Sequence, residues 1–65
     1  MLSQYIEQLI GAGLTELEIA KRVRTSQPTI NRIRRGASTS YELGRRIEAL
    51  HRDRFPEVGN ETQAA

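Results

Sequence analysis

Residues 14–36 read LTELEIAKRVRTSQPTINRIRRG, and the fold of this 65-residue chain follows from them. Apolar residues recur at helical spacing on both sides of residues 24–26, so the stretch predicts two short helices joined by a three-residue turn. Six basic residues and no acidic one lie from Ile19 to Gly36, whereas the rest of the chain has four basic and eight acidic residues. A net charge of +2 therefore combines a segment of +6 with a remainder of −4. This asymmetry points to a polyanionic partner.

The first helix of this pair has a well-defined start. Thr15 is followed three residues later by Glu18, a capping box in which each side chain binds the other's free backbone N–H. Leu14 and Ile19 stand at the positions of a hydrophobic staple, which fixes how the chain enters the helix. The inner stripe consists of Ile19, Ala20 and Val23. The small Ala20 lets the second helix approach closely.

The second helix of the pair begins after Ser26, a good N-cap, and ends at Gly36. Pro28 is tolerated in its first turn because the missing N–H would have had no partner. At about 100° per residue, Ile30 and Ile33 point to one side and are the expected buried pair. The opposite side then carries Pro28, Arg32 and Arg35, with Gln27 and Asn31 on one flank and Thr29 on the other. Such a face suits the major groove of DNA, since these side chains match the hydrogen-bonding edges of bases.

A further helix is expected before this pair. Ser3 can cap it, and it should run to about Ile10, with Tyr5 or Ile6, Leu9 and Ile10 on its apolar side. Gly11 and Gly13 end it, because glycine readily takes the left-handed conformation at a helix end.

A last helix is expected after the pair. Thr39 and Glu42 repeat the capping-box spacing at its start, and Pro56 closes it. Its apolar side consists of Leu43, Ile47, Leu50 and Phe55. Residues 1–58 are therefore expected to form one domain, followed by a small, polar, flexible tail over residues 59–65.

The remaining charged side chains of the last helix have plainer expected roles. Its basic residues should form a solvated face, paired at i, i+3 and i, i+4 with nearby acids. The basic residues are Arg45, Arg46, Arg52 and Arg54, and the acids are Glu42, Glu48 and Asp53. Two roles stay open for Tyr41: it could donate to a phosphate, or it could cover the core.

The composition excludes several classes of function. The chain has no Cys, so disulfides and thiolate metal sites are ruled out, as suits a reducing cytoplasm. No apolar run approaches the ~20 residues of a membrane span, and no signal-peptide pattern opens the chain. The single histidine, His51, is expected on the surface, without a catalytic constellation around it. We therefore expect no enzyme, no cofactor, no metal and no small-molecule ligand.

The central stretch resembles the helix-turn-helix of the Cro and CI-type phage repressor family, whose members have a four- or five-helix, lambda-repressor-like domain. The resemblance is carried by Leu14, Thr15, Ile19, Ala20, Lys21, Val23, Ser26, Gln27, Thr29, Ile30, Arg32, Ile33 and Gly36. It implies that the second helix of the pair lies in the major groove. The residues that would read bases are then Gln27, Pro28, Thr29, Asn31 and Arg32. Those that would lie at the DNA backbone are Thr15, Glu16, Ser26, Arg35, Ser38 and Tyr41.

Three residues depart from the family pattern. Arg24 stands where the turn usually has Gly, so it must adopt the left-handed conformation or alter the turn. Glu16 stands where the family often has Gln, and phosphate would repel it unless it pairs with Arg32 or accepts from a cytosine amine. Arg34 replaces a commonly acidic residue, so a salt bridge to the first helix must be lost or reversed, with Glu7 as the candidate partner.

The sequence thus predicts a small all-α, sequence-specific double-stranded DNA-binding protein, most like a Cro repressor that occludes a promoter at a pseudo-palindromic operator. A homodimer is expected, in solution or only on DNA, and its candidate contact consists of Phe55, Pro56 and Val58. A DNA-binding antitoxin or an excision-type accessory factor is the alternative within this class. A small helical module that binds a protein is the alternative outside it. RNA is less favoured, because the aromatic residues that could stack on bases are only Tyr5, Tyr41 and Phe55.

Overall fold

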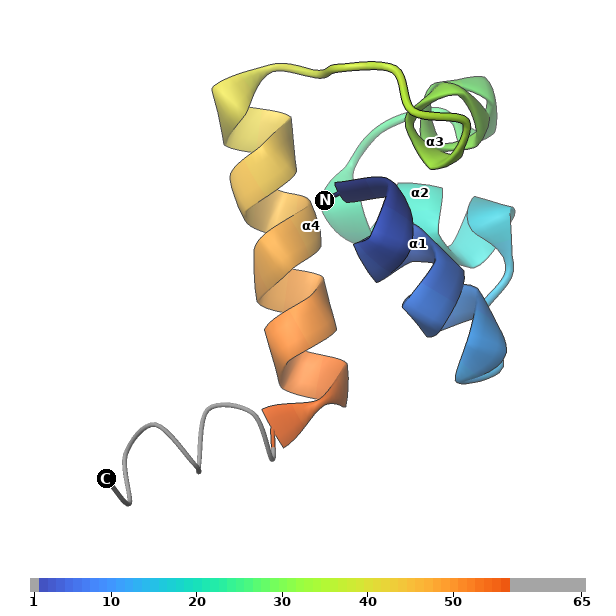
Figure 1. Cartoon of the computed structure of the whole chain (residues 1–65), viewed down its shortest axis with the longest axis vertical. Helices are drawn as coiled ribbons and strands as arrows, with labels where there is room; N and C mark the ends of the chain where they lie inside the picture. The colour runs from blue at the N-terminus through green and yellow to red at the C-terminus, as the bar shows by residue number, and fades with distance from the viewer. Residues whose placement is uncertain (1, 57–65) are drawn as a thin grey trace.

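The chain folds into four α-helices in the computed structural model, which describes residues 2–56. The helices are α1 (Leu2–Gly11), α2 (Glu16–Val23), α3 (Gln27–Arg34) and α4 (Tyr41–Arg54). No strand occurs within these residues, so the predicted all-α class is confirmed. Figure 1 shows the long α4 along one side of the molecule and the three shorter helices gathered on the other. The expected boundary between domain and tail, at residues 58 and 59, lies outside the described residues.

The core draws on every helix. Its nine buried residues are Ile6, Leu9, Leu14, Ile19, Ala20, Val23, Ile30, Ile33 and Ile47. They include the predicted stripe of α2, the predicted pair of α3 and the staple residue that precedes α2. Partly buried apolar side chains surround this cluster, namely Leu2, Tyr5, Ile10, Leu43, Leu50 and Phe55. Within residues 2–56, α3 packs against α1 and α2, and none of its Cα atoms lies within 8 Å of a Cα atom of α4.

The start of α1 differs from the prediction. The helix already includes Leu2, so Ser3 lies inside it and does not cap it. Leu2 packs against the core, and its Cδ1 lies 3.4 Å from where a Cβ on Gly44 would stand. This contact with α4 favours a helical residue before Ser3. At the other end, Gly13 has a φ of 106° after the helix, as expected, whereas Gly11 is the last helical residue and is not left-handed.

The predicted start of α2 is confirmed. The Thr15 backbone N–H donates to Glu18 Oε1 at 2.9 Å, and the Glu18 N–H donates to Thr15 Oγ1 at 3.1 Å. The helix ends at Val23, and Arg24 follows with φ 64° and ψ 51°, which is the left-handed conformation. The Thr25 N–H then donates to the carbonyl of Ala20 at 2.9 Å and closes the turn. Arg24 therefore keeps the tight turn by adopting the conformation that glycine usually supplies.

The cap of α3 matches the prediction, and the cap of α4 does not. Ser26 caps α3 as expected, with Pro28 in the first turn. The cap of α4 is Ser40, whose Oγ accepts from the Leu43 N–H at 3.2 Å, so the predicted capping box of Thr39 and Glu42 is wrong. The Glu42 carboxylate instead accepts from Arg46 Nη2 at 2.9 Å, one turn further along α4. The methyl group of Thr39 lies 3.9 Å from the Cβ position of Gly44, so this side chain is turned toward the protein.

Candidate nucleic-acid interface

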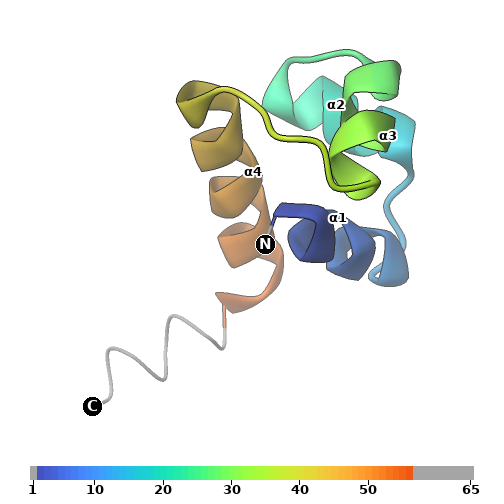
Figure 2. The same ribbon diagram turned by 45° about the horizontal axis from the view of Figure 1, so that its top comes forward.

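Helix α3 presents one face to the core and the other to solvent. Ile30 and Ile33 are 0% and 1% exposed and hold the inner face against the rest of the protein. Pro28, Arg32 and Arg35 are exposed on the outer face, as the periodicity predicts. Figure 2 shows α3 beside α2 at the surface, away from α4. Among residues 2–56, neither Arg32 nor Arg35 forms an ion pair.

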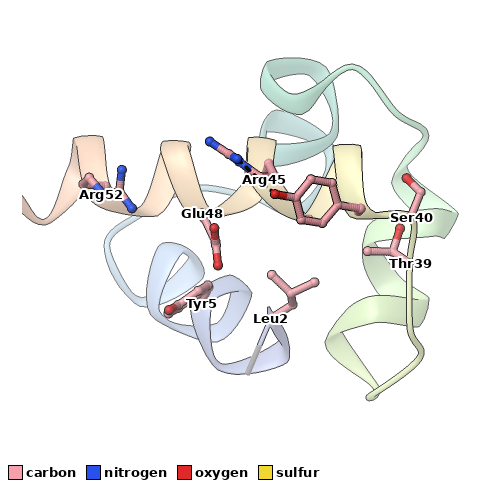
Figure 3. Close-up of a pocket in the computed structure, with 9 residues that line it drawn as sticks. Leu2, Tyr5, Thr39, Ser40, Arg45, Glu48 and Arg52 are labelled. Carbon is pink, nitrogen blue, oxygen red and sulfur yellow. Dashed lines mark hydrogen bonds between the residues drawn. The ribbon is translucent and has the colours of Figure 1, made fainter.

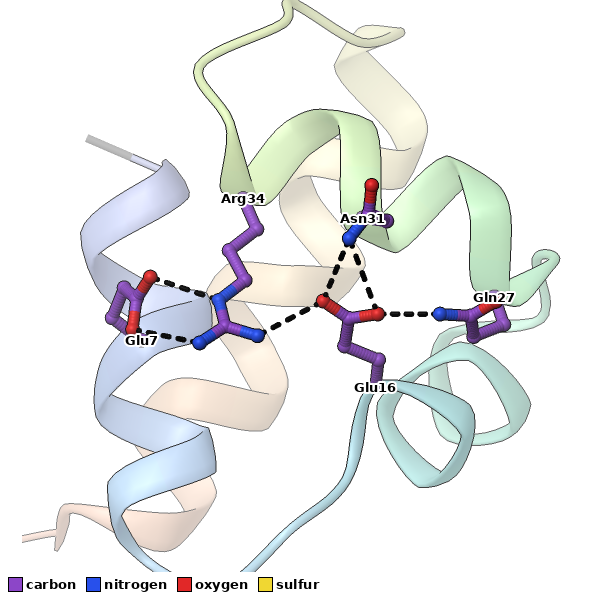
Figure 4. Close-up of polar contacts among 5 residues, drawn as sticks. All are labelled: Glu7, Glu16, Gln27, Asn31 and Arg34. Atoms are coloured by element: carbon purple, nitrogen blue, oxygen red, sulfur yellow. Dashed lines mark hydrogen bonds and ion pairs between the residues drawn. The ribbon is translucent and has the colours of Figure 1, made fainter.

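Glu16, the first residue of α2, joins that helix to one flank of α3 (Figure 4). Its carboxylate accepts hydrogen bonds from Gln27 Nε2, from Asn31 Nδ2 at 3.1 Å and from Arg34 Nη1 at 3.0 Å. These three donors stand at i, i+4 and i+7 of α3 and fall within about 60° of one another around the helix. The hydrogen bond from Arg34, and then that from Asn31, lower the pKa of Glu16, so the carboxylate is ionised at neutral pH.

Arg34 extends this network to α1. Its Nε donates to Glu7 Oε2 at 2.8 Å and its Nη2 to Glu7 Oε1 at 3.4 Å, a two-pronged contact between α3 and α1. The bonds to Glu7 and then to Glu16 raise the pKa of Arg34. The predicted pairing of Arg34 with Glu7 is therefore confirmed. We call Glu7, Arg34, Glu16, Asn31 and Gln27 the inter-helix network.

One predicted partner of Glu16 is wrong. Arg32 does not pair with it, because Arg32 lies about 100° round α3 from Asn31 and projects into solvent. Arg34 takes that place on the flank that faces α2. The side chain of Glu16 is only 15% exposed, and its carboxylate faces protein donors. The sequence already contained the signal for this contact, the i, i+4, i+7 spacing of Gln27, Asn31 and Arg34.

The remaining candidate DNA contacts lie around the ends of α2, α3 and α4. Thr15 serves the capping box, and the hydroxyls of Ser26 and Thr29 lie 2.9 Å apart and share a hydrogen bond. Ser38 and Tyr41 are exposed in and after the loop that follows α3. Tyr41 is 80% exposed, so the alternative in which it covers the core is wrong. Its hydroxyl accepts from Arg45 Nη1 at 3.1 Å, and the Arg45 guanidinium carbon lies 5.7 Å from its ring centre.

A groove of about 590 Å³ runs between the start of α1 and α4. Figure 3 shows Leu2 and Tyr5 on the α1 side, with Arg45, Glu48 and Arg52 along α4. The groove is lined by apolar groups and by charges of both signs, a mixture that does not select one ligand chemistry. Of the ion pairs predicted among the charged residues of α4, the one that forms within residues 2–56 joins Arg46 to Glu42.

His51 is the clearest departure from the sequence prediction. It is half-buried rather than a surface side chain. The centre of its ring lies 4.3 Å from the ring centre of Tyr5 and 4.7 Å from that of Phe55. Its Nε2 is hydrogen-bonded to Gln8 Oε1, and burial lowers its pKa.

Of the candidate dimer contact, Phe55 packs against the protein's own core, whereas Pro56 is exposed. The third residue of the candidate dimer contact, Val58, lies outside the described residues.

Residues 2–56 contain neither a cluster of metal-binding side chains nor a membrane-spanning helix. No group of three or more His, Cys, Asp or Glu side chains within residues 2–56 is placed to hold a metal ion. None of the four helices is long and apolar enough to cross a membrane. Comparison with family models, with curated proteins and with solved structures finds no match to this chain.

Proposed function

We propose that this chain is a sequence-specific double-stranded DNA-binding regulator in which α2 and α3 act as a helix-turn-helix. The observation that carries the proposal is the outer face of α3, where Arg32 and Arg35 are exposed on a helix anchored by two buried isoleucines. A single helix fits the major groove, and arginine reads guanine through two hydrogen bonds. Because Ile30 and Ile33 hold α3 in the core, the backbone of this helix would already be in place on binding.

Electrostatics supports the same partner. The stretch from Ile19 to Gly36 carries six positive charges and no negative one, so it favours a polyanion over a neutral protein surface. Two acids that contact α3, Glu7 and Glu16, are paired with Arg34. Phosphates near α3 would therefore meet Arg32, Arg35 and the helix start rather than unpaired carboxylates.

The mechanism in this proposal is occlusion, as in a Cro-like repressor. Two copies would place their α3 helices in successive major grooves about 34 Å apart, on a pseudo-palindromic operator. In this proposal the residues near bases are Gln27, Pro28, Thr29, Asn31 and Arg32. The residues near the backbone are Thr15, Ser26, Arg35, Ser38 and Tyr41.

Selection of bound sequences from a random duplex library tests this proposal. We expect an enriched inverted repeat, and we expect Arg32→Ala to lose preference at one base pair per half-site, costing about 1–3 kcal/mol there. Arg54→Ala is the matched control, since it removes the same charge from the far end of α4 (Figure 1) and should leave the preference unchanged. No enriched sequence would contradict the proposal and favour a protein-binding module.

Affinity for the selected duplex should also fall steeply with salt. A plot of log affinity against log salt concentration should have a slope of about −0.9 for each phosphate that the protein neutralises. A flat response would contradict an interface built on arginine and phosphate.

A further inference from the structure

The inter-helix network restrains the amide groups of two proposed base-reading residues. Gln27 and Asn31 each direct their NH₂ group at Glu16, through Gln27 Nε2 and Asn31 Nδ2. An ionised carboxylate only accepts hydrogen bonds, so an amide beside it must turn its nitrogen inward. Figure 4 shows this arrangement, with the oxygen of Asn31 directed away from Glu16. The chemistry of the carboxylate thus determines which end of each amide faces outward.

The ionised state of Glu16 is itself maintained by the network. Arg34 lies 3.0 Å from Glu16 Oε2 and also binds Glu7, so a positive charge is held against the carboxylate from the α1 side. Glu16 is only 15% exposed, which limits the access of water that could compete for its oxygens. The network therefore holds the partly buried amides of Gln27 and Asn31 with their nitrogens toward Glu16, which fixes their polarity.

The major groove distinguishes the two polarities. Adenine and cytosine present an exocyclic amine there, which donates, whereas guanine and thymine present a carbonyl oxygen, which accepts. An amide whose oxygen faces outward can accept from the amine of adenine or cytosine. An amide free to rotate by 180° could equally donate to guanine or thymine, and it would lose this discrimination.

We propose that Glu16 is a positioning residue for specificity: it fixes the polarity of Gln27 and Asn31, so that α3 selects adenine or cytosine over guanine or thymine on the strand facing these amides. This inference rests on the proposed DNA-binding function. It differs from the sequence-based expectation for Glu16, which placed the carboxylate itself at the DNA.

Parallel selections from one random duplex library test the inference. The positions read by Gln27 are first defined as those where Gln27→Ala loses preference. At these positions the unaltered protein should favour amino bases over keto bases by about tenfold or more. Glu16→Gln has nearly the same shape but can both donate and accept, so it should reduce this preference to about twofold or less. It should leave the preference due to Arg32 in place.

Glu7→Gln is the matched control. It also removes one negative charge from the network, but it leaves Glu16 in contact with both amides. It should raise affinity for all duplexes to a similar extent as Glu16→Gln and keep the preference for amino bases. Thermal unfolding followed by circular dichroism shows which variants are folded.

Two results would overturn the inference while leaving the proposed function intact. One is a preference of the unaltered protein for keto bases at the positions defined by Gln27→Ala, a readout that does not require Glu16→Gln to fold. The other is a folded Glu16→Gln variant with an unchanged preference for amino bases. If no sequence is enriched by the unaltered protein, the proposed function itself fails, and the inference fails with it.

Discussion

Replacing Arg24 by glycine should make the protein more stable. Arg24 has φ 64° and ψ 51°, where the Cβ of an L-residue crowds the neighbouring carbonyl oxygen at a cost of about 1–2 kcal/mol. Glycine removes this cost, but it also gives the unfolded chain more freedom, which offsets about 0.4–1 kcal/mol. The balance is a gain of about 0.5–1 kcal/mol in the free energy of unfolding. For a domain of this size that corresponds to a Tm about 2–8 °C higher.

The assay is urea and thermal unfolding followed by circular dichroism, with Arg24→Ala as the control. Alanine also removes the positive charge and the long side chain, but it keeps the Cβ and therefore the strain. Arg24→Ala should lie within about 0.5 kcal/mol of the unaltered protein. If Arg24→Gly is no more stable than Arg24→Ala, then backbone strain at this position contributes nothing measurable, and the reasoning is refuted.

Three other predictions concern caps, turns and pH. Gly13→Ala should cost about 1–2 kcal/mol in urea unfolding, because its φ is positive. Gly11→Ala, at a helical position with open space, should instead gain about 0.5–1 kcal/mol, and equal effects would contradict this account. Thr15→Ala should lose about 0.5–2 kcal/mol with the capping box, and an unchanged urea midpoint would argue against that role. Burial lowers the pKa of His51 in the folded state, so the unfolded chain binds the proton first, and stability should be full above pH 6.5 and fall as the pH drops below it. His51→Gln should lose this slope between pH 7 and pH 5, and a slope that persists would assign it to other groups.

Local signals in the sequence predicted most of the fold. The capping box of Thr15 and Glu18 involves residues three apart, and the burial of Ile30 and Ile33 follows from helical periodicity alone. The left-handed Arg24 was also foreseen as one of two outcomes, because a turn this short needs that conformation. Short-range chemistry was therefore sufficient for the α2–α3 pair.

Two of the wrong predictions share a physical cause, since each involves contacts between distant parts of the chain. Ser3 is a good cap by itself, but the packing of Leu2 near Gly44 extends α1 past it. His51 is bound to Gln8, 43 residues away, and no local pattern in α4 indicates that partner. The cap of α4 is a different case, since Ser40 replaces Thr39 through the local bond from the Leu43 N–H to Ser40 Oγ.

The candidate site was predicted in part. Its exposed residues follow from the face of α3 opposite the isoleucines, and the reversed pair of Arg34 with Glu7 was expected. The role of Glu16 was not, because Arg32 or a cytosine amine was expected as its partner, and the i, i+4, i+7 spacing of Gln27, Asn31 and Arg34 was not used. The way that α3 lies on α2 decides for Arg34, and this orientation is a property of the packed core.

The claim that α3 binds DNA through its outer face is tested most directly by an NMR titration of the ¹⁵N-labelled protein with a duplex selected from the random library. We predict that the largest amide shifts occur from Ser26 to Ser38 and at the start of α2, with small shifts in the second half of α4. Shifts concentrated along the groove between α1 and α4, with α3 unaffected, would contradict the account.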